Sequence, residues 1–230
     1  MDKYYVARRR GCERVHRTLM QSALPSLRKR YGDQDADRVL IAAKDHFGRL
    51  LPGIPYIGGK RNSFTGTLVK AASLLALYRV LQPRGITAAD FGAIAAETAQ
   101  HYVMRYPSWL RRLIGMLYAS RWYRRRVAGF AAASQRSPYP ADFVYEVVEG
   151  DGQAFDWGID YQRCGIVHYF HAQGADELSP HMCWLDNLTY PAIGIDLVRT
   201  GTLAQGCTHC DFRFRTGAGQ SSSSNSSHRS

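Results

Sequence analysis

The sequence predicts an α+β fold, in which an N-terminal helical region is followed by an antiparallel sheet with flanking helices. Apolar residues recur every three or four positions through most of residues 3–134, as they do along one side of an α-helix. After Pro138-Tyr139-Pro140 the pattern changes to short runs rich in valine and aromatic residues, separated by glycine-containing turns. Helices that precede the strands, rather than alternate with them, are typical of an α+β fold.

The helical region is predicted to consist of several helices separated by proline and glycine. Two helices are expected within residues 3–48, with interruptions at Pro25 and Gly32. Residues 50–62 contain too many prolines and glycines for regular structure, and we expect a structured loop there. Helices are then predicted over residues 64–81, over residues 88–105 with Thr87 as N-cap, and over residues 107–134.

The remainder of the chain is predicted to form the sheet and its flanking helices. Strands are expected over residues 143–148, 155–161, 196–202 and 210–215, and helices over residues 166–173 and 180–193. We therefore predict a single α+β domain over residues 1–216, of which residues 1–136 are mainly helical and residues 137–216 contain the sheet and the functional site. The serine-rich residues 217–230 cannot bury apolar surface and are predicted to be a disordered tail.

The formal charge of +11 comes mostly from arginines, which are dense in residues 8–30 and 105–126. They stand at helical spacing beside apolar residues such as Trp109 and Leu113, and no nucleic-acid-binding signature accompanies them. We expect a solvated helix face or an attraction for anionic substrates, and no nucleic-acid partner. A secretory signal pattern and an uninterrupted membrane span are both missing from the sequence, which predicts a cytoplasmic protein with no membrane span. The oligomeric state stays open.

Cysteine and aspartate cluster in the last third of the chain. Five cysteines without a secretory signal indicate reduced thiols rather than a disulfide framework. If Cys183 and Asp186 share a helix, their spacing places thiol and carboxylate on one face, where the carboxylate can act as a base. The competing interpretation, favoured if the pair is isolated, is a buried small apolar Cys183 and a solvated Asp186.

A metal ion or a redox pair is an alternative use of the same cysteines. The spacing of Cys207 and Cys210 suits zinc ligands, and His209 is a candidate third ligand, as are His168 and His171. Structural zinc sites normally use two such pairs, so a bound metal is less favoured than no cofactor. The pair precedes a predicted strand rather than opening a helix, which disfavours a redox motif.

Several segments, taken as an ordered set, resemble the L-2-amino-thiazoline-4-carboxylic acid hydrolase family. They span nearly the whole predicted domain, and each alone is short. The segments are IPYIGGKRN at 54–62, YEVVEGDG at 145–152, DYQRCGI at 160–166, MCWLD at 182–186, RTGTLAQG at 199–206 and CDFRF at 210–214.

The resemblance implies hydrolytic opening of a small cyclic amidine, such as L-2-amino-thiazoline-4-carboxylate, to N-carbamoyl-L-cysteine. Water adds at the carbon between the ring nitrogen and sulfur. The residues at matching positions fall into two sets, one expected to be catalytic and one expected to bind the small-molecule substrate. The catalytic candidates are Cys164, Cys183, Asp186 and Cys210, and the substrate-binding candidates are Asn62, Asp160, Arg199, Thr200 and Asp211.

Roles within these two groups follow from the chemistry that the resemblance implies. Cys164 or Cys183 is expected as nucleophile or site thiol, and Asp186 as general base. Arg199 is expected to clamp the substrate carboxylate, because a guanidinium binds a carboxylate in bidentate fashion.

One segment departs from the family pattern. Before the final cysteine the family has Glu-Gly-Gly and an acidic residue, whereas this chain has Gln205-Gly206-Cys207-Thr208. The alternative to an enzyme is therefore a non-catalytic small-molecule-binding domain, or a metal-sensing or redox-sensing domain, of the same fold.

Overall fold

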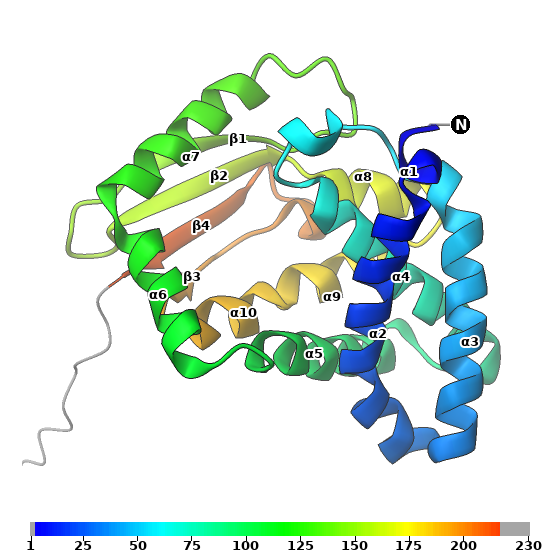
Figure 1. Ribbon diagram of the computed structural model, residues 1–230. Helices are drawn as coiled ribbons and strands as arrows, with labels where there is room; N and C mark the ends of the chain where they lie inside the picture. The colour runs from blue at the N-terminus through cyan, green and yellow to red at the C-terminus, as the bar shows by residue number, and fades with distance from the viewer. Residues whose placement is uncertain (1–2, 217–230) are drawn as a thin grey trace, which may run out of the picture.

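The computed structural model describes residues 3–216 and confirms the α+β fold, with a helical N-terminal region and a four-stranded antiparallel sheet (Figure 1). The helices that precede the sheet are α1 (Lys3–Ala7), α2 (Arg9–Tyr31), α3 (Asp33–Leu50), α4 (Thr65–Leu81), α5 (Ala88–Met104), α6 (Ser108–Ala119) and α7 (Arg121–Ser134). The elements that follow are β1 (Val144–Glu149), β2 (Trp157–Arg163), α8 (Gly165–Ala172), α9 (Ser179–Trp184), α10 (Asp186–Ala192), β3 (Asp196–Val198) and β4 (Cys210–Arg215). The predicted tail at residues 217–230 lies outside the described residues.

The helix boundaries confirm some predictions and correct others. Thr87 caps α5 as predicted, in a capping box with Asp90. Pro25, however, lies inside α2 and does not interrupt it, because packing against α3, α4 and α5 outweighs the lost backbone hydrogen bond. The predicted helix over residues 107–134 is two helices, since Ser120 is extended and its hydroxyl accepts a hydrogen bond from the Tyr123 amide at 3.2 Å, which begins α7.

The sheet has the strand order β1-β2-β4-β3, and every neighbouring pair is antiparallel. Alternation along β2 and β4 places Tyr161, Cys210 and Phe212 on the inner face, where they meet the core. Asp160 and Asp211 pair directly across the two strands and lie on the outer face. The strand predicted over residues 196–202 ends at Val198, because the chain then turns to bind the Asp211 side chain through the backbone amides of Thr200 and Gly201.

Figure 1 shows the sheet on one side of the molecule and α2 to α5 on the other, with α8, α9 and α10 between them. Buried apolar side chains form one cluster that runs from Tyr5 to Phe214. Helix α4 is buried on almost every side, which explains why its apolar residues follow no single stripe. The layer of short helices against the inner face of the sheet contains the candidate site.

None of the helices in the described part of the chain combines the length and the apolar character that crossing a membrane requires.

Candidate active site

A cavity of about 230 Å³ lies between the inner face of the sheet and the α9–α10 segment. Five residues predicted from the sequence line it together: Cys164, Cys183, Asp186, Arg199 and Cys210. Drug-sized ligands occupy pockets of roughly 300–1,000 Å³, so a cavity of this size suits a smaller molecule. The aromatic walls include Phe64, Phe143, Tyr161, Tyr190 and Phe212.

The secondary structure explains why these side chains converge. Cys164 immediately precedes α8 and Cys210 begins β4, so both stand at the same end of the sheet. The predicted helix over residues 180–193 is broken at Leu185, but the backbone there stays near-helical (φ −59°, ψ −24°). Cys183 and Asp186 therefore keep the one-turn spacing predicted for them and both line the cavity.

Arg199 is held by the protein on several sides. Its Nη1 donates to Asp186 Oδ2 at 3.0 Å, and its Nη2 donates to the Cys183 carbonyl oxygen at 2.7 Å. The guanidinium carbon also lies 4.9 Å from the centroid of the Phe212 ring, and only 7% of the side chain is exposed. A buried cation is stable only when it is paired and hydrogen-bonded, and these contacts meet that requirement.

Asp186 titrates close to neutral pH. Burial raises the pKa of its carboxyl from 3.8 to about 6, and the neighbouring Arg199 guanidinium opposes part of that increase. The side chain is 34% exposed, through the surface that borders the cavity. A carboxyl group with a pKa near the operating pH is suited to general acid–base catalysis.

The cavity thiols are protonated at neutral pH. Burial raises the pKa of Cys164 to about 11, although the backbone amides of Ile166 and Val167 partly oppose the increase. Burial likewise raises the pKa of Cys183 to about 12. The Cys210 pKa is also raised by burial, and its sulfur accepts a hydrogen bond from the Leu203 amide at 3.1 Å. Because the thiolate is the nucleophilic form, these thiols are weak nucleophiles.

Two tyrosines of the cavity were missed by the sequence predictions. Tyr161 and Tyr190 line it, and Tyr118 behind them hydrogen-bonds to both Tyr190 and Tyr123. Burial raises the pKa of all four hydroxyls, which are therefore neutral. The alternation of β2 was a usable signal for Tyr161, since it faces the side opposite to Asp160.

The sequence predictions also did not include Lys70 among the candidate site residues. It lines a second cavity of about 200 Å³, which shares Thr67, Ile166, Met182 and Asp186 with the first. Burial lowers the pKa of its ammonium group, which lies over the Tyr102 ring at 5.1 Å from the centroid. None of the ion pairs within residues 3–216 includes Lys70. The sequence signal was a single lysine within the apolar run Leu68-Val69-Lys70-Ala71-Ala72 of this helix.

The model of the L-2-amino-thiazoline-4-carboxylic acid hydrolase family matches residues 68–214, which is well over half of the chain. The chain belongs to this family. No curated protein and no solved structure matches it. The matched region extends from α4 to β4 and therefore contains Lys70 and all the cavity cysteines, together with Asp186 and Arg199.

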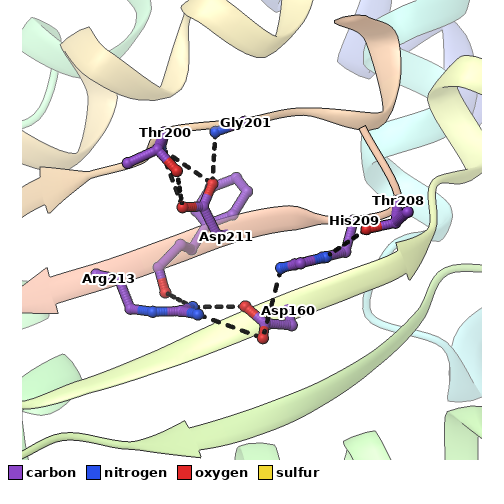
Figure 2. A network of polar contacts seen from close by, with 8 residues as sticks. Asp160, Thr200, Gly201, Thr208, His209, Asp211 and Arg213 are labelled. Atoms are coloured by element: carbon purple, nitrogen blue, oxygen red, sulfur yellow. Dashed lines mark hydrogen bonds and ion pairs between the residues drawn. The ribbon is translucent and has the colours of Figure 1, made fainter. Parts of the chain in front are cut away.

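Three substrate-binding candidates that the resemblance to this hydrolase family implied lie on the outer face of the sheet, away from the cavity (Figure 2). Asp160 forms an ion pair with Arg213. Asp211 accepts hydrogen bonds from the Thr200 amide and hydroxyl at 3.0 and 2.6 Å, and from the Gly201 amide at 2.7 Å. Asp211 and Thr200 thus hold the turn that follows Arg199.

The remaining substrate-binding candidate, Asn62, lines a larger cavity of about 560 Å³. Its amide nitrogen donates to the Ile57 carbonyl and to Asp142 Oδ1, both at 2.7 Å, and its oxygen accepts from the Phe64 amide at 2.9 Å. Asn62 therefore shapes the loop before α4. The stacked rings of Phe64 and Phe143, 4.3 Å apart, line both this cavity and the cysteine cavity.

The metal alternative is not supported, because residues 3–216 contain no group of three or more His, Cys, Asp or Glu side chains able to hold an ion. The physical reason is the alternation that begins at β4. Cys210 points into the inner cavity, whereas His209 turns to the outer face, where its Nε2 lies 3.9 Å from Asp160 Oδ2. Cys207 is exposed in the preceding turn, so the three predicted ligands diverge.

These environments predict different thiol reactivities. With an aromatic disulfide reagent near neutral pH, exposed Cys207 should react quickly. Cys164, Cys183 and Cys210 should react slowly, because Cys210 is buried, Cys164 and Cys183 are partly buried, and burial raises the pKa of all three thiols. Absorbance of the released thiol should show a fast phase that Cys207→Ser removes and Cys164→Ser leaves unchanged. A fast phase that survives Cys207→Ser and disappears in Cys183→Ser would contradict the protonated state assigned to the cavity.

Proposed function

We propose that the protein hydrolyses a small cyclic amidine bearing a carboxylate, such as L-2-amino-thiazoline-4-carboxylate, to N-carbamoyl-L-cysteine. The observation that supports this most directly is the partly buried Asp186 carboxyl, with a pKa of about 6, on the wall of a small cavity in a chain of this hydrolase family. Burial is the main cause of the pKa shifts of Asp186, Cys164 and Cys183, and shifted pKa values of this kind are typical of catalytic sites.

The reaction adds one water molecule and breaks one carbon–sulfur bond. The water oxygen bonds to the ring carbon between nitrogen and sulfur and becomes the carbonyl oxygen of the product. One proton of the water ends on the former ring nitrogen and the other on the sulfur, which leaves as the product thiol. The site must therefore take a proton from water and deliver protons to nitrogen and sulfur.

Asp186 is the group we assign to the attacking water. Above a pH of about 6 it is mostly ionised and can accept the proton as the carbon–oxygen bond forms. Arg199 donates a hydrogen bond to Oδ2 and so restricts the rotation of the carboxylate. Once protonated, Asp186 can return the proton to the departing sulfur or the ring nitrogen.

The cysteines then act as neutral thiols rather than as nucleophiles. Cys164, Cys183 and Cys210 present polarizable sulfur and weak S–H donors to a ring that itself contains sulfur. Their raised pKa values favour direct attack by water over displacement of the ring sulfur by a cysteine, which would give a covalent isothiourea adduct. This departs from the expectation of a cysteine nucleophile, and Asp186 keeps the role of base.

Lys70 is the better candidate for binding the substrate carboxylate. Both terminal nitrogens of Arg199 already donate to protein oxygens, so Arg199 acts as a positioning residue for Asp186. Lys70 is a partly buried cation outside the ion pairs of the described chain, and Asp186 is among the residues that its cavity shares with the cysteine cavity. A substrate carboxylate bound there would give the Lys70 ammonium group the counter-ion that stabilises a charge removed from water.

The direct test is incubation of the purified protein with L-2-amino-thiazoline-4-carboxylate, followed by mass spectrometry. We expect a product heavier by one water molecule, together with a new free thiol. Tight binding of the compound without product would contradict the hydrolase and support the non-catalytic binding domain.

Asp186→Asn should lower kcat/KM by about two to four orders of magnitude, the usual contribution of a general base. In the unmodified protein kcat/KM should rise with pH up to about 6 and then level off, because only the ionised carboxylate accepts a proton. The matched control is Asp160→Asn, which changes an aspartate on the outer face and should keep the same pH profile. An unchanged pH limb in Asp186→Asn would exclude this residue as the base.

Lys70→Met should raise KM by about tenfold to a hundredfold with a smaller change in kcat, since a charged hydrogen bond contributes about 1.5–3 kcal/mol. Steady-state kinetics on the carboxylate substrate and on its uncharged carboxamide would measure the effect, which should vanish for the carboxamide. Lys60→Met, in the neighbouring cavity, is the control. Equal KM values for Lys70→Met and the unmodified protein would contradict the role of Lys70 and favour Arg199 as the residue that binds the substrate carboxylate.

A further inference from the structure

Helix α6 presents large apolar side chains to solvent. Trp109, Leu113, Met116 and Leu117 are 65%, 50%, 63% and 43% exposed. Their spacing places them along one side of the helix, and we call these four residues the α6 face. An exposed apolar stripe of this kind on a folded protein indicates a surface that is covered by something else.

The opposite side of α6 is what holds the helix to the protein. Gly115 is buried so closely against the Ile193 carbonyl that an added Cβ would lie 2.1 Å from its oxygen. Arg111 Nη1 donates to the neighbouring Ala192 carbonyl oxygen at 3.0 Å. The helix is thus docked on the end of α10 by a glycine and an arginine, while the four side chains of the α6 face are exposed to solvent.

Helix α7 continues the pattern with apolar and cationic groups interleaved. Trp122 is 61% exposed and Phe130 39% exposed, and the Arg126 guanidinium carbon lies over both rings, 5.7 and 5.2 Å from their centroids. Figure 1 shows α6 and α7 following each other along one edge of the molecule. Tryptophan beside arginine is the combination found where proteins meet the headgroup region of a bilayer.

The charge of this segment defines its partner. Residues 98–141 contain eight arginines and no aspartate or glutamate. Arg105, Arg112, Arg121, Arg125 and Arg126 are exposed. Such a surface favours a partner that offers negative charge on the outside and an apolar layer beneath it.

We propose that the α6 face, together with the exposed arginines of α6 and α7, binds the surface of a membrane that contains anionic lipids. The helix would lie in the plane of the interface, with the α6 face inserted among the acyl chains and the arginines beside the lipid phosphates. This association needs no membrane-spanning helix, and none was found in the described residues.

Other occupants fit the same surface less well. A second copy of the chain would bring two arginine-rich segments together without a single acidic residue from residues 98–141 to compensate. A nucleic acid would meet the arginines but leave Leu113, Met116 and Leu117 facing a phosphate backbone. Residues 217–230 contain no large apolar side chain that could cover the stripe.

The test is co-sedimentation of the full chain with vesicles of phosphatidylcholine alone and of phosphatidylcholine mixed with phosphatidylglycerol. We expect binding to the anionic vesicles only, weakened by salt. Trp109→Ser combined with Met116→Ser should weaken binding at least about tenfold because apolar contact is lost. Arg121→Gln and Arg125→Gln should each weaken it by about fivefold.

Matched controls separate this surface from general properties of the protein. Ile41→Ser removes an apolar side chain that is as exposed as Trp109 but lies on α3, and Arg10→Gln with Arg14→Gln removes the same charge from α2. Both should leave vesicle binding nearly unchanged, and circular dichroism verifies that each variant is folded.

Three outcomes would overturn the proposal. One is equal binding by the α6 variants and the controls. Another is a dimer in light scattering that Trp109→Ser combined with Met116→Ser converts to a monomer, with no vesicle binding. The third is binding to duplex DNA or RNA at physiological salt without binding to vesicles.

Discussion

The buried Arg199 guanidinium is the interaction on which the candidate site depends. It joins the Cys183 carbonyl of α9, the Asp186 carboxylate of α10 and the Phe212 ring of β4. A cation buried to this degree is costly unless every one of these partners is in place, so the three elements are coupled to one another. From the other side of the sheet, Asp211 fixes the turn after Arg199 through backbone amides. The segments 182–186 and 210–214 therefore both contribute to positioning Arg199.

Burial raises the pKa of the aspartate and of the thiols alike, yet the two kinds of group differ in protonation state at neutral pH. It raises the pKa of Asp186 only to about 6, because Arg199 compensates, and the carboxylate stays available as a base. It raises the pKa values of Cys164 and Cys183 from 9.0 to about 11 and 12, and the thiols stay neutral. One cavity thus separates the roles of its titratable groups, because a carboxyl has a much lower ordinary pKa than a thiol.

The cysteine cavity and the α6 face are connected through a single short helix. Asp186 begins α10, and Ala192 at its other end accepts the hydrogen bond that holds α6. The contact of Gly115 with Ile193 completes this attachment. Docking of α6 on a membrane would therefore take place at the far end of the helix that positions the proposed base.

The sequence by itself determined the order of helices and strands, because apolar periodicity and turn residues act locally. It also determined the family, through motifs whose cavity members, Cys164, Cys183, Asp186, Arg199 and Cys210, do converge. The breaks at Ser120 and Leu185 depend on packing and capping and were not predicted. Strand alternation already implied that Asp160 and Asp211 face away from Tyr161 and Cys210, but only the assembled sheet shows which face borders the cavity.

Only the tertiary structure decided which of two cations has a carboxylate partner. Lys70 and Arg199 both follow Leu-Val in the sequence, and this local pattern does not distinguish them. The fold gives Arg199 a carboxylate and a carbonyl as partners, and it leaves Lys70 partly buried beside Tyr102. Long-range contacts between α4, α10 and β4 make that difference, because the free energy of a buried charge is set by neighbours that are distant along the chain.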